Sequence, residues 1–182
     1  IRAVVYRKPL RVDSALLEVR QGDLRDPGFC RSAVQGMDYV FHCAAYTTGA
    51  YTAATTPMEH VTPNIVMNAY LFEACYEAGV QKVLWLGSTT GYPDTGYRPV
   101  VEEDMFVGEP YSKYFFVGWM KRYSEILART YCEKLPRRMP IVVLRPTNVY
   151  GEWDKTDPKL SHVVPALIRR VAERQDPFVV WG

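Results

Sequence analysis

The stretch VQKVLWLGSTT, residues 80–90, decides the fold. Its apolar run predicts a buried β-strand over residues 80–86, and small polar residues follow directly at 87–90. A helical pattern over residues 63–78 precedes the strand, and Gly79 is placed to end that helix. The order helix, buried strand and small polar turn is the repeating unit of an α/β protein.

The same alternation extends in both directions along the chain. Further strands are predicted over residues 1–6, 16–20, 38–43 and 141–144, and a last one begins at 178–181. Further helices are predicted over residues 27–35, with Asp26 as the N-cap, over 114–133 and over 162–173. Strands that are continuously apolar and separated by helices predict a doubly wound parallel sheet, with both faces buried and right-handed crossovers.

The composition is that of one globular domain. The chain has 182 residues, of which 48% are apolar and 23% charged, so disorder and low complexity are excluded. A net charge of +2 is too small to indicate a nucleic-acid or anionic-membrane partner. The scattered basic pairs, Lys121-Arg122, Arg137-Arg138 and Arg169-Arg170, are interpreted as solvated helix faces and a loop.

No metal site or membrane span is expected. The four cysteines form no CxxC pair and the three histidines form no HExxH motif, which argues against structural zinc. No run of 18 apolar residues occurs, and the first residues lack the features of a signal peptide. We therefore expect a cytoplasmic protein with reduced, mostly buried thiols.

Polar and small residues follow the predicted strands where a ligand would bind. In open parallel sheets the ligand lies beyond the carboxyl ends of the strands. These ends carry Arg7, Asp23 and the groups at residues 43–45, 88–90 and 146–148, a mixture that suits a dinucleotide. The loop over residues 87–110 is long for a compact domain, which predicts a functional segment or a lid.

Four motifs carry a family resemblance: LGSTTGYP at 86–93, RPTNVYG at 145–151, LSHVVPALIRR at 160–170 and VVWG at 179–182. In this order they resemble the extended short-chain dehydrogenase/reductase superfamily of NAD-dependent epimerases and dehydratases, and within it the GDP-fucose synthase branch. The resemblance implies a nucleotide-sugar epimerase/reductase that uses NADP, with NAD as the alternative. It also implies a nucleoside-diphosphate sugar substrate, GDP-linked in this branch, and a homodimer formed through two long helices. The alternatives are another nucleotide-sugar epimerase/dehydratase and a catalytically degenerate nucleotide-binding protein of the same fold.

The resemblance also indicates what these residues do not contain. The family begins with a strand and a Gly-rich turn that hold the pyrophosphate, and no GxGxxG or GxxGxxG occurs here. We therefore expect a fragment, with a truncated NAD(P)-binding Rossmann-like domain over 1–150 and the start of the nucleotide-sugar substrate region over 151–182. The missing strand belongs in the middle of the sheet, so an unfilled slot with unpaired strand edges is expected.

The cofactor contacts implied by the resemblance lie at the strand ends. A basic residue at Arg7 suits the 2′-phosphate of NADP, and Asp23 matches an adenine contact. His42, in contrast, is interpreted as a packed strand residue. The full implied cofactor-binding set is Arg7, Asp23, Ala44, Ala45, Lys121 and Pro146.

The catalytic set implied by the resemblance is Ser88, Lys121, His162 and Thr90. Ser88 matches the serine that hydrogen-bonds the reacting sugar oxygen. His162 matches an acid/base of epimerisation. Thr90 stands where these synthases carry a cysteine, and threonine is a much poorer proton carrier near neutral pH.

The YxxxK motif of the superfamily is incomplete in this sequence. Lys121 matches its lysine, but Val117 stands at the tyrosine position four residues earlier. Valine cannot donate a proton, so Tyr111 and Tyr114 remain as possible substitutes. Substrate contacts implied by the resemblance are Asn148, Arg170 and Trp181.

Overall fold

The computed structural model describes residues 1–47, 55–154, 161–178 and 180. The strands are β1 (Arg2–Val5), β2 (Glu18–Gln21), β3 (Tyr39–His42), β4 (Lys82–Leu86) and β5 (Ile141–Leu144). The α-helices are α1 (Pro27–Val34), α3 (Pro57–Glu77), α4 (Phe115–Glu133) and α5 (Val163–Ala172). Three short 3₁₀ turns are η1 (Thr89–Gly91), η2 (Glu102–Phe106) and η3 (Ser112–Tyr114).

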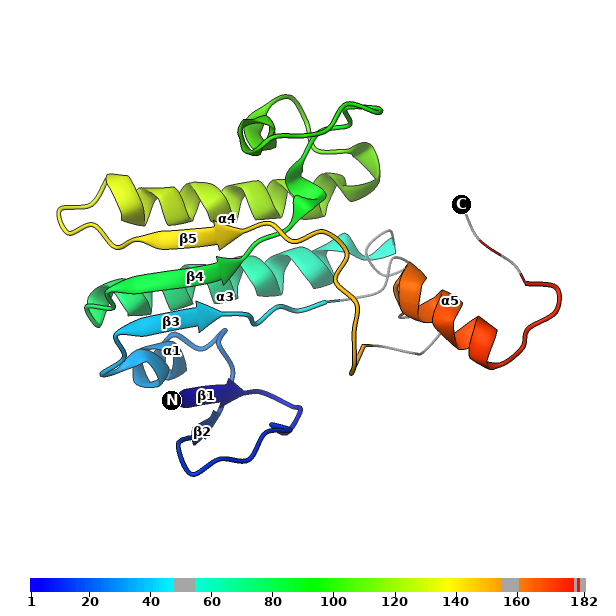
Figure 1. The fold of residues 1–182 in the computed structure, drawn as a ribbon. Coiled ribbons are helices and arrows are strands. Elements are labelled where there is room, and N and C mark those ends of the chain that lie inside the picture. Colours follow the sequence, from blue (N-terminus) through cyan, green and yellow to red (C-terminus); the bar gives the residue numbers. More distant parts are fainter. Residues whose placement is uncertain (48–54, 155–160, 179, 181–182) are drawn as a thin grey trace.

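All paired strands run parallel, which confirms the predicted α/β class (Figure 1). β1 pairs with β2, with Arg2 opposite Glu18. β4 lies between β3 and β5, with Val83 opposite Ile141. Parallel neighbours require crossover connections, and α3 and α4 supply them on either side of β4.

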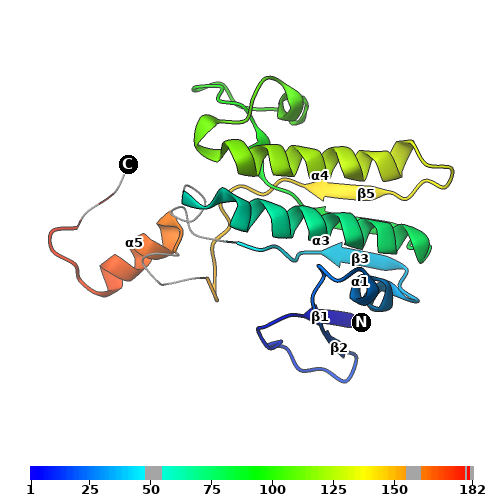
Figure 2. The same ribbon diagram turned by 180° about the vertical axis from the view of Figure 1, so that it is seen from behind.

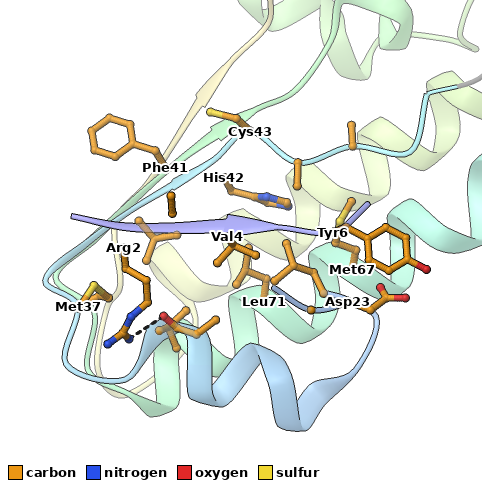
Figure 3. Close-up of a pocket in the computed structure, with 18 of the residues that line it drawn as sticks. Arg2, Val4, Tyr6, Asp23, Met37, Phe41, His42, Cys43, Met67 and Leu71 are labelled. Carbon is orange, nitrogen blue, oxygen red and sulfur yellow. Dashed lines mark hydrogen bonds between the residues drawn. The ribbon is translucent and has the colours of Figure 1, made fainter. Parts of the chain in front are cut away.

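The sheet is interrupted between β1 and β3. The two-stranded and three-stranded parts are separate sheets, so among the described residues neither β1 nor β3 has a hydrogen-bonded neighbour on the facing edge. A cavity of about 890 Å³ separates them, lined by residues of both strands and by α1 and α3 (Figure 3). The unfilled slot expected from the sequence is present at this position.

The helices that pack on the sheet lie on one of its faces. Figure 2 shows α3 and α4 in front of the strands, and α1 packs beside α3. The opposite face is exposed, with Phe41 at 72% exposure. Its other exposed apolar side chains are Val4, Val19, Tyr39, Val142 and Leu144. The prediction that both faces are buried is therefore not met by the described residues.

Helix ends follow the capping residues, with one correction. Asp26 caps α1 as predicted, because its Oδ1 accepts from the backbone N–H of Gly28 at 2.7 Å. α3 begins at Pro57, six residues earlier than predicted, and contains Pro63 in its interior. Proline has no backbone N–H, so it is common in the first turn of a helix, where that donor has no partner within the helix. For this reason Pro63 was interpreted as the start of the helix. Gly79 follows the C-cap of α3 with φ of +77°, a conformation that glycine adopts at low cost.

The core forms between the sheet and the helix layer. Phe72 of α3 makes an edge contact with Trp85 of β4, with ring centroids 5.9 Å apart. Cys30 and Cys75 are buried in the same cluster, and burial raises their thiol pKa values to about 11 and about 12. Cys132 is half-buried and Cys43 is exposed.

The C-terminal prediction of a strand at 178–181 is wrong where it can be compared, because Phe178 and Val180 lie outside any strand. The other two residues of that prediction lie outside the described part of the chain. Within the described residues, no helix is both long and apolar enough to cross a bilayer.

Candidate functional site

Ser88 and Thr90 form a compact polar turn just beyond the carboxyl end of β4. The backbone N–H and the hydroxyl of Thr90 both donate to Ser88 Oγ, at 3.2 and 3.1 Å. The N–H of Thr89 donates to the carbonyl of Pro146, which follows β5. Three residues predicted from the sequence, Ser88, Thr90 and Pro146, are thereby brought together by adjacent strand ends.

Arg122 anchors the segment that follows this turn. Its guanidinium donates to the carbonyls of Gly91, Val107 and Gly108, and the side chain is only 2% exposed. The interpretation of the Lys121-Arg122 pair as a solvated helix face is therefore wrong for Arg122. The loop over residues 87–110 is held against α4 by a buried cation that sequence reasoning missed.

An ion pair between a half-buried arginine and a buried glutamate holds another part of the loop. Glu125 of α4 accepts two hydrogen bonds from Arg145, at 2.9 and 2.7 Å. The second terminal nitrogen of Arg145 donates to the hydroxyl of Tyr92 and to the carbonyl of Glu102. Arg145 begins the RPTNVYG motif, so part of this motif positions the loop.

The first turn of α4 packs directly on the Ser88–Thr90 turn. A Cβ added at Gly118 would lie 2.7 Å from the carbonyl oxygen of Thr90 and 2.4 Å from Pro110 Cβ. Only glycine allows this approach without a shift of the backbone. The start of α4 is consequently held next to Ser88.

Tyr111 lies in the segment that enters α4 and is tied to the same loop. Its N–H donates to the carbonyl of Tyr92 at 3.0 Å, and its side chain is half-buried. Tyr114 also precedes the helix, but its side chain is 50% exposed. Val117 is half-buried within the helix itself. Of the two tyrosines left open by the sequence, Tyr111 is the one bonded to the segment that follows Ser88.

Lys121 extends from α4 toward the sheet. Its Nζ lies 5.2 Å from the centre of the Trp85 ring, and no hydrogen bond or ion pair joins it to any residue in the described part of the chain. Burial lowers the pKa of Lys121 to about 8, and the charge of Glu125 opposes this shift. An amine with this pKa is partly neutral near physiological pH.

Replacement of Lys121 by methionine should raise the free energy of unfolding at pH 7 by about 1–3 kcal/mol. Below pH 8 the ammonium is protonated in the folded and unfolded chains, so the desolvation cost is fully present. Between pH 8 and 10.5 only the unfolded chain retains the proton, so stability of the original chain rises with pH. Urea unfolding across this range should show that rise, and Lys121→Met should lack it. Equal pH profiles would contradict the burial of this charge.

A second polar group surrounds Tyr6 beyond β1. Arg7 is exposed and donates to the Tyr6 hydroxyl at 3.3 Å, and Arg25 donates to the same oxygen at 3.1 Å. Arg25 also forms a 2.5 Å ion pair with Asp23 and lowers the pKa of that carboxyl to about 2. Arg7 and Asp23 are therefore brought into one cluster, and Arg25, which sequence reasoning missed, joins them.

Ala44 and Ala45 continue β3 along the wall of the cavity. Both are exposed at the carboxyl end of the strand, and the cofactor strip stays a prediction. The residues present fit the two ends of a dinucleotide: a basic cluster beyond β1, and small residues beyond β3, with Lys121 of α4 over the Trp85 ring of β4. A Gly-rich turn for the central pyrophosphate is not found in the sequence.

α5 carries the remaining predicted residues and lies beyond the carboxyl ends of β3, β4 and β5 (Figure 1). His162 is the exposed N-cap residue of this helix, and Arg170 is in its last turn. Asn148 is exposed in the segment after β5. Trp181 lies outside the described residues.

Comparison with known proteins places these features in a family context. Residues 3–182 match the NAD dependent epimerase/dehydratase family. A GDP-L-fucose synthase of Sinorhizobium fredii is 33% identical over 151 residues, which cover 79% of this chain and 46% of the relative. The chain thus spans about half the length of the curated relatives that it matches.

Solved structures share the fold. A GDP-L-fucose synthetase from Naegleria fowleri bound to NADP superimposes with a TM-score of 0.77 at 28% identity, covering 91% of this chain and 57% of that one. A UDP-N-acetylglucosamine 4-epimerase from Methanobrevibacter ruminantium, in complex with UDP-N-acetylmuramic acid, gives a TM-score of 0.75 at 26% identity. That comparison covers 88% of this chain and 49% of the epimerase.

Proposed function

This chain belongs to the NAD dependent epimerase/dehydratase family, and on that premise we propose that the whole protein is a nucleotide-sugar epimerase/reductase of the GDP-fucose synthase type. The observation that carries the proposal is the hydrogen-bonded hydroxyl pair of Ser88 and Thr90 at the carboxyl end of β4, with Tyr111 tied to the following loop by its backbone N–H. A hydroxyl cluster at this edge of a parallel sheet is suited to a sugar carbonyl. The identity to GDP-L-fucose synthases supports the same assignment.

The cofactor of the whole protein is NADP, with NAD as the alternative. Arg7 and Arg25 supply guanidinium groups beyond β1 that suit a 2′-phosphate. Ala44 and Ala45 allow a nicotinamide ring to approach the backbone, and Lys121 offers a cation for its ribose. We assign residues 1–150 to cofactor binding and residues 151–182 to the beginning of the substrate region.

Each residue of the site has a distinct role in the proposed reaction. NADPH, when bound, supplies the hydride to a sugar carbonyl carbon. Ser88 donates a hydrogen bond to the carbonyl oxygen, and Tyr111 donates the proton that this oxygen takes up. His162 is the acid/base for the sugar carbons that epimerise, and Asn148, Arg170 and Trp181 contact the nucleotide sugar. Thr90 orients Ser88 rather than carrying a proton, because its hydroxyl already donates to Ser88 Oγ.

The direct test is oxidation of NADPH by the whole protein in the presence of GDP-4-keto-6-deoxymannose. We expect loss of NADPH absorbance with the GDP-linked ketosugar, and loss of that turnover in Ser88→Ala. Turnover with UDP-linked sugars alone would favour the broader epimerase/dehydratase assignment. NADPH binding without turnover would indicate the degenerate nucleotide-binding protein, and absence of both would contradict the proposal.

The proposed assembly is a homodimer through α3 and α4. The outward side of α4 exposes apolar side chains at helical spacing, namely Phe116, Trp119, Tyr123 and Ile126. These side chains share a stripe turned away from the residues that pack on the sheet, so they are free to meet the same stripe of a second copy.

A further inference from the structure

The polar cluster beyond β1 is organised around one phenol oxygen. Arg7 and Arg25 both donate to Tyr6 Oη, at 3.3 and 3.1 Å, although their two guanidinium groups carry the same charge. The Cζ atoms of these groups also lie over the Tyr6 ring, 4.9 and 5.7 Å from its centroid. The Tyr6 side chain therefore holds two cations next to each other, and the negative face of its ring offsets part of their repulsion.

The carboxylate of Asp23 neutralises only one of these cations. Its Oδ2 lies 2.5 Å from a terminal nitrogen of Arg25, and both of its oxygens accept from Arg25 Nε at 3.0 Å. The Tyr6 hydroxyl lies beside the same carboxylate (Figure 3), and a hydrogen bond from it contributes to the low pKa of Asp23. Arg7 forms no ion pair within the described part of the chain, so the cluster carries a net positive charge.

Two neighbouring guanidinium groups and one carboxylate respond differently to a phosphate and to a hydroxyl. A phosphate monoester carries a charge of roughly −2 near neutral pH and accepts paired N–H donors from both guanidinium groups. The Asp23 carboxylate competes for one of these groups, because Arg25 is already bonded to it. A ribose hydroxyl carries no charge, and it can donate to the carboxylate while the ion pair stays in place.

We propose that the Tyr6 hydroxyl and the Asp23–Arg25 ion pair determine the choice between NADP and NAD. Tyr6 holds Arg25 beside Arg7, so that both cations meet the 2′-phosphate, and Asp23 limits this preference by competing for Arg25. The protein then accepts both dinucleotides and prefers NADP. This inference rests on the proposed nicotinamide cofactor and adds to it the residues that decide between the two forms.

Isothermal titration calorimetry of the whole protein with NADP⁺ and with NAD⁺ tests the inference, because it measures binding without turnover. Arg25→Met should raise the Kd for NADP⁺ about 10–100-fold and change the Kd for NAD⁺ by less than about threefold. Tyr6→Phe keeps the ring and removes the oxygen that both guanidinium groups share. It should raise the Kd for NADP⁺ about 3–10-fold and leave the Kd for NAD⁺ unchanged.

Asp23→Asn should have the opposite effect on cofactor choice. Without the competing carboxylate, Arg25 is available to the 2′-phosphate, so the ratio of the two Kd values should move about tenfold in favour of NADP⁺. The ratio is the right measure, because any contact between Asp23 and the adenine is common to both dinucleotides. Arg31→Met is the matched control. It removes an exposed arginine from the last turn of α1 and should change the ratio by less than about twofold.

Equal effects of Arg25→Met on the two Kd values would overturn the inference. A ratio that Asp23→Asn leaves unchanged, or moves toward NAD⁺, would overturn it as well. Failure of the proposed function is a separate result: the expected ratios without turnover of any nucleotide sugar would support the inference and contradict the proposed reaction. If neither dinucleotide binds the original protein, both proposals are wrong.

Discussion

Tyr111→Phe in the whole protein should lower kcat about 10²–10⁴-fold with little change in the KM for the nucleotide sugar. The change removes one hydroxyl and keeps the ring that packs 6.0 Å from Tyr114. Loss of a positioned acid affects the transition state more than it affects substrate binding, which is why kcat carries the effect. Steady-state kinetics of NADPH oxidation measure both parameters.

Tyr114→Phe is the matched control. It also removes one tyrosine hydroxyl, but from an exposed side chain three residues after Tyr111. It should leave kcat within a factor of about two. Val117→Tyr tests the rival assignment, in which the acid belongs four residues before Lys121. If Val117→Tyr raises activity and Tyr111→Phe leaves it unchanged, the assignment of Tyr111 is wrong.

The fold could be predicted because the strands carry a local signal. Ile141–Leu144 was delimited from its apolar run alone, and Asp26 with Pro27 marked the start of α1. The continuous apolar runs also predicted burial on both faces of the sheet, and here the chain differs. Phe41 and Val142 are exposed on the uncovered face. The apolar pattern of these strands is typical of burial on both faces, but none of the described residues covers this one.

The residues of the candidate site were harder to predict, because the contacts that hold them in place join distant segments. Ser88 could be proposed as a site residue from the family resemblance and from its place at a strand end. Nothing local distinguishes Arg122 from a solvated arginine, since its three carbonyl partners lie 14 to 31 residues away. The pairing of Arg145 with Glu125 similarly requires the helix and the strand end to be placed in three dimensions.

Arg145→Met should lower the free energy of unfolding by about 3–5 kcal/mol. The substitution leaves the carboxylate of Glu125, whose side chain is 7% exposed, without its cation. It also removes the donor to Tyr92 and Glu102, which releases one attachment of the loop after Ser88. Urea unfolding gives the change in stability, with circular dichroism as the probe.

The double variant Arg145→Met/Glu125→Leu separates the two causes. If most of the loss comes from stranding a buried charge, removing that charge as well should restore more than half of the lost stability. If the loss comes instead from detaching the loop, the double variant should be as unstable as the single one, because the carbonyl of Glu102 stays unpaired in both. The double variant could regain the free energy of unfolding without regaining NADPH turnover. That result would show that the ion pair positions the loop for catalysis and contributes little to stability.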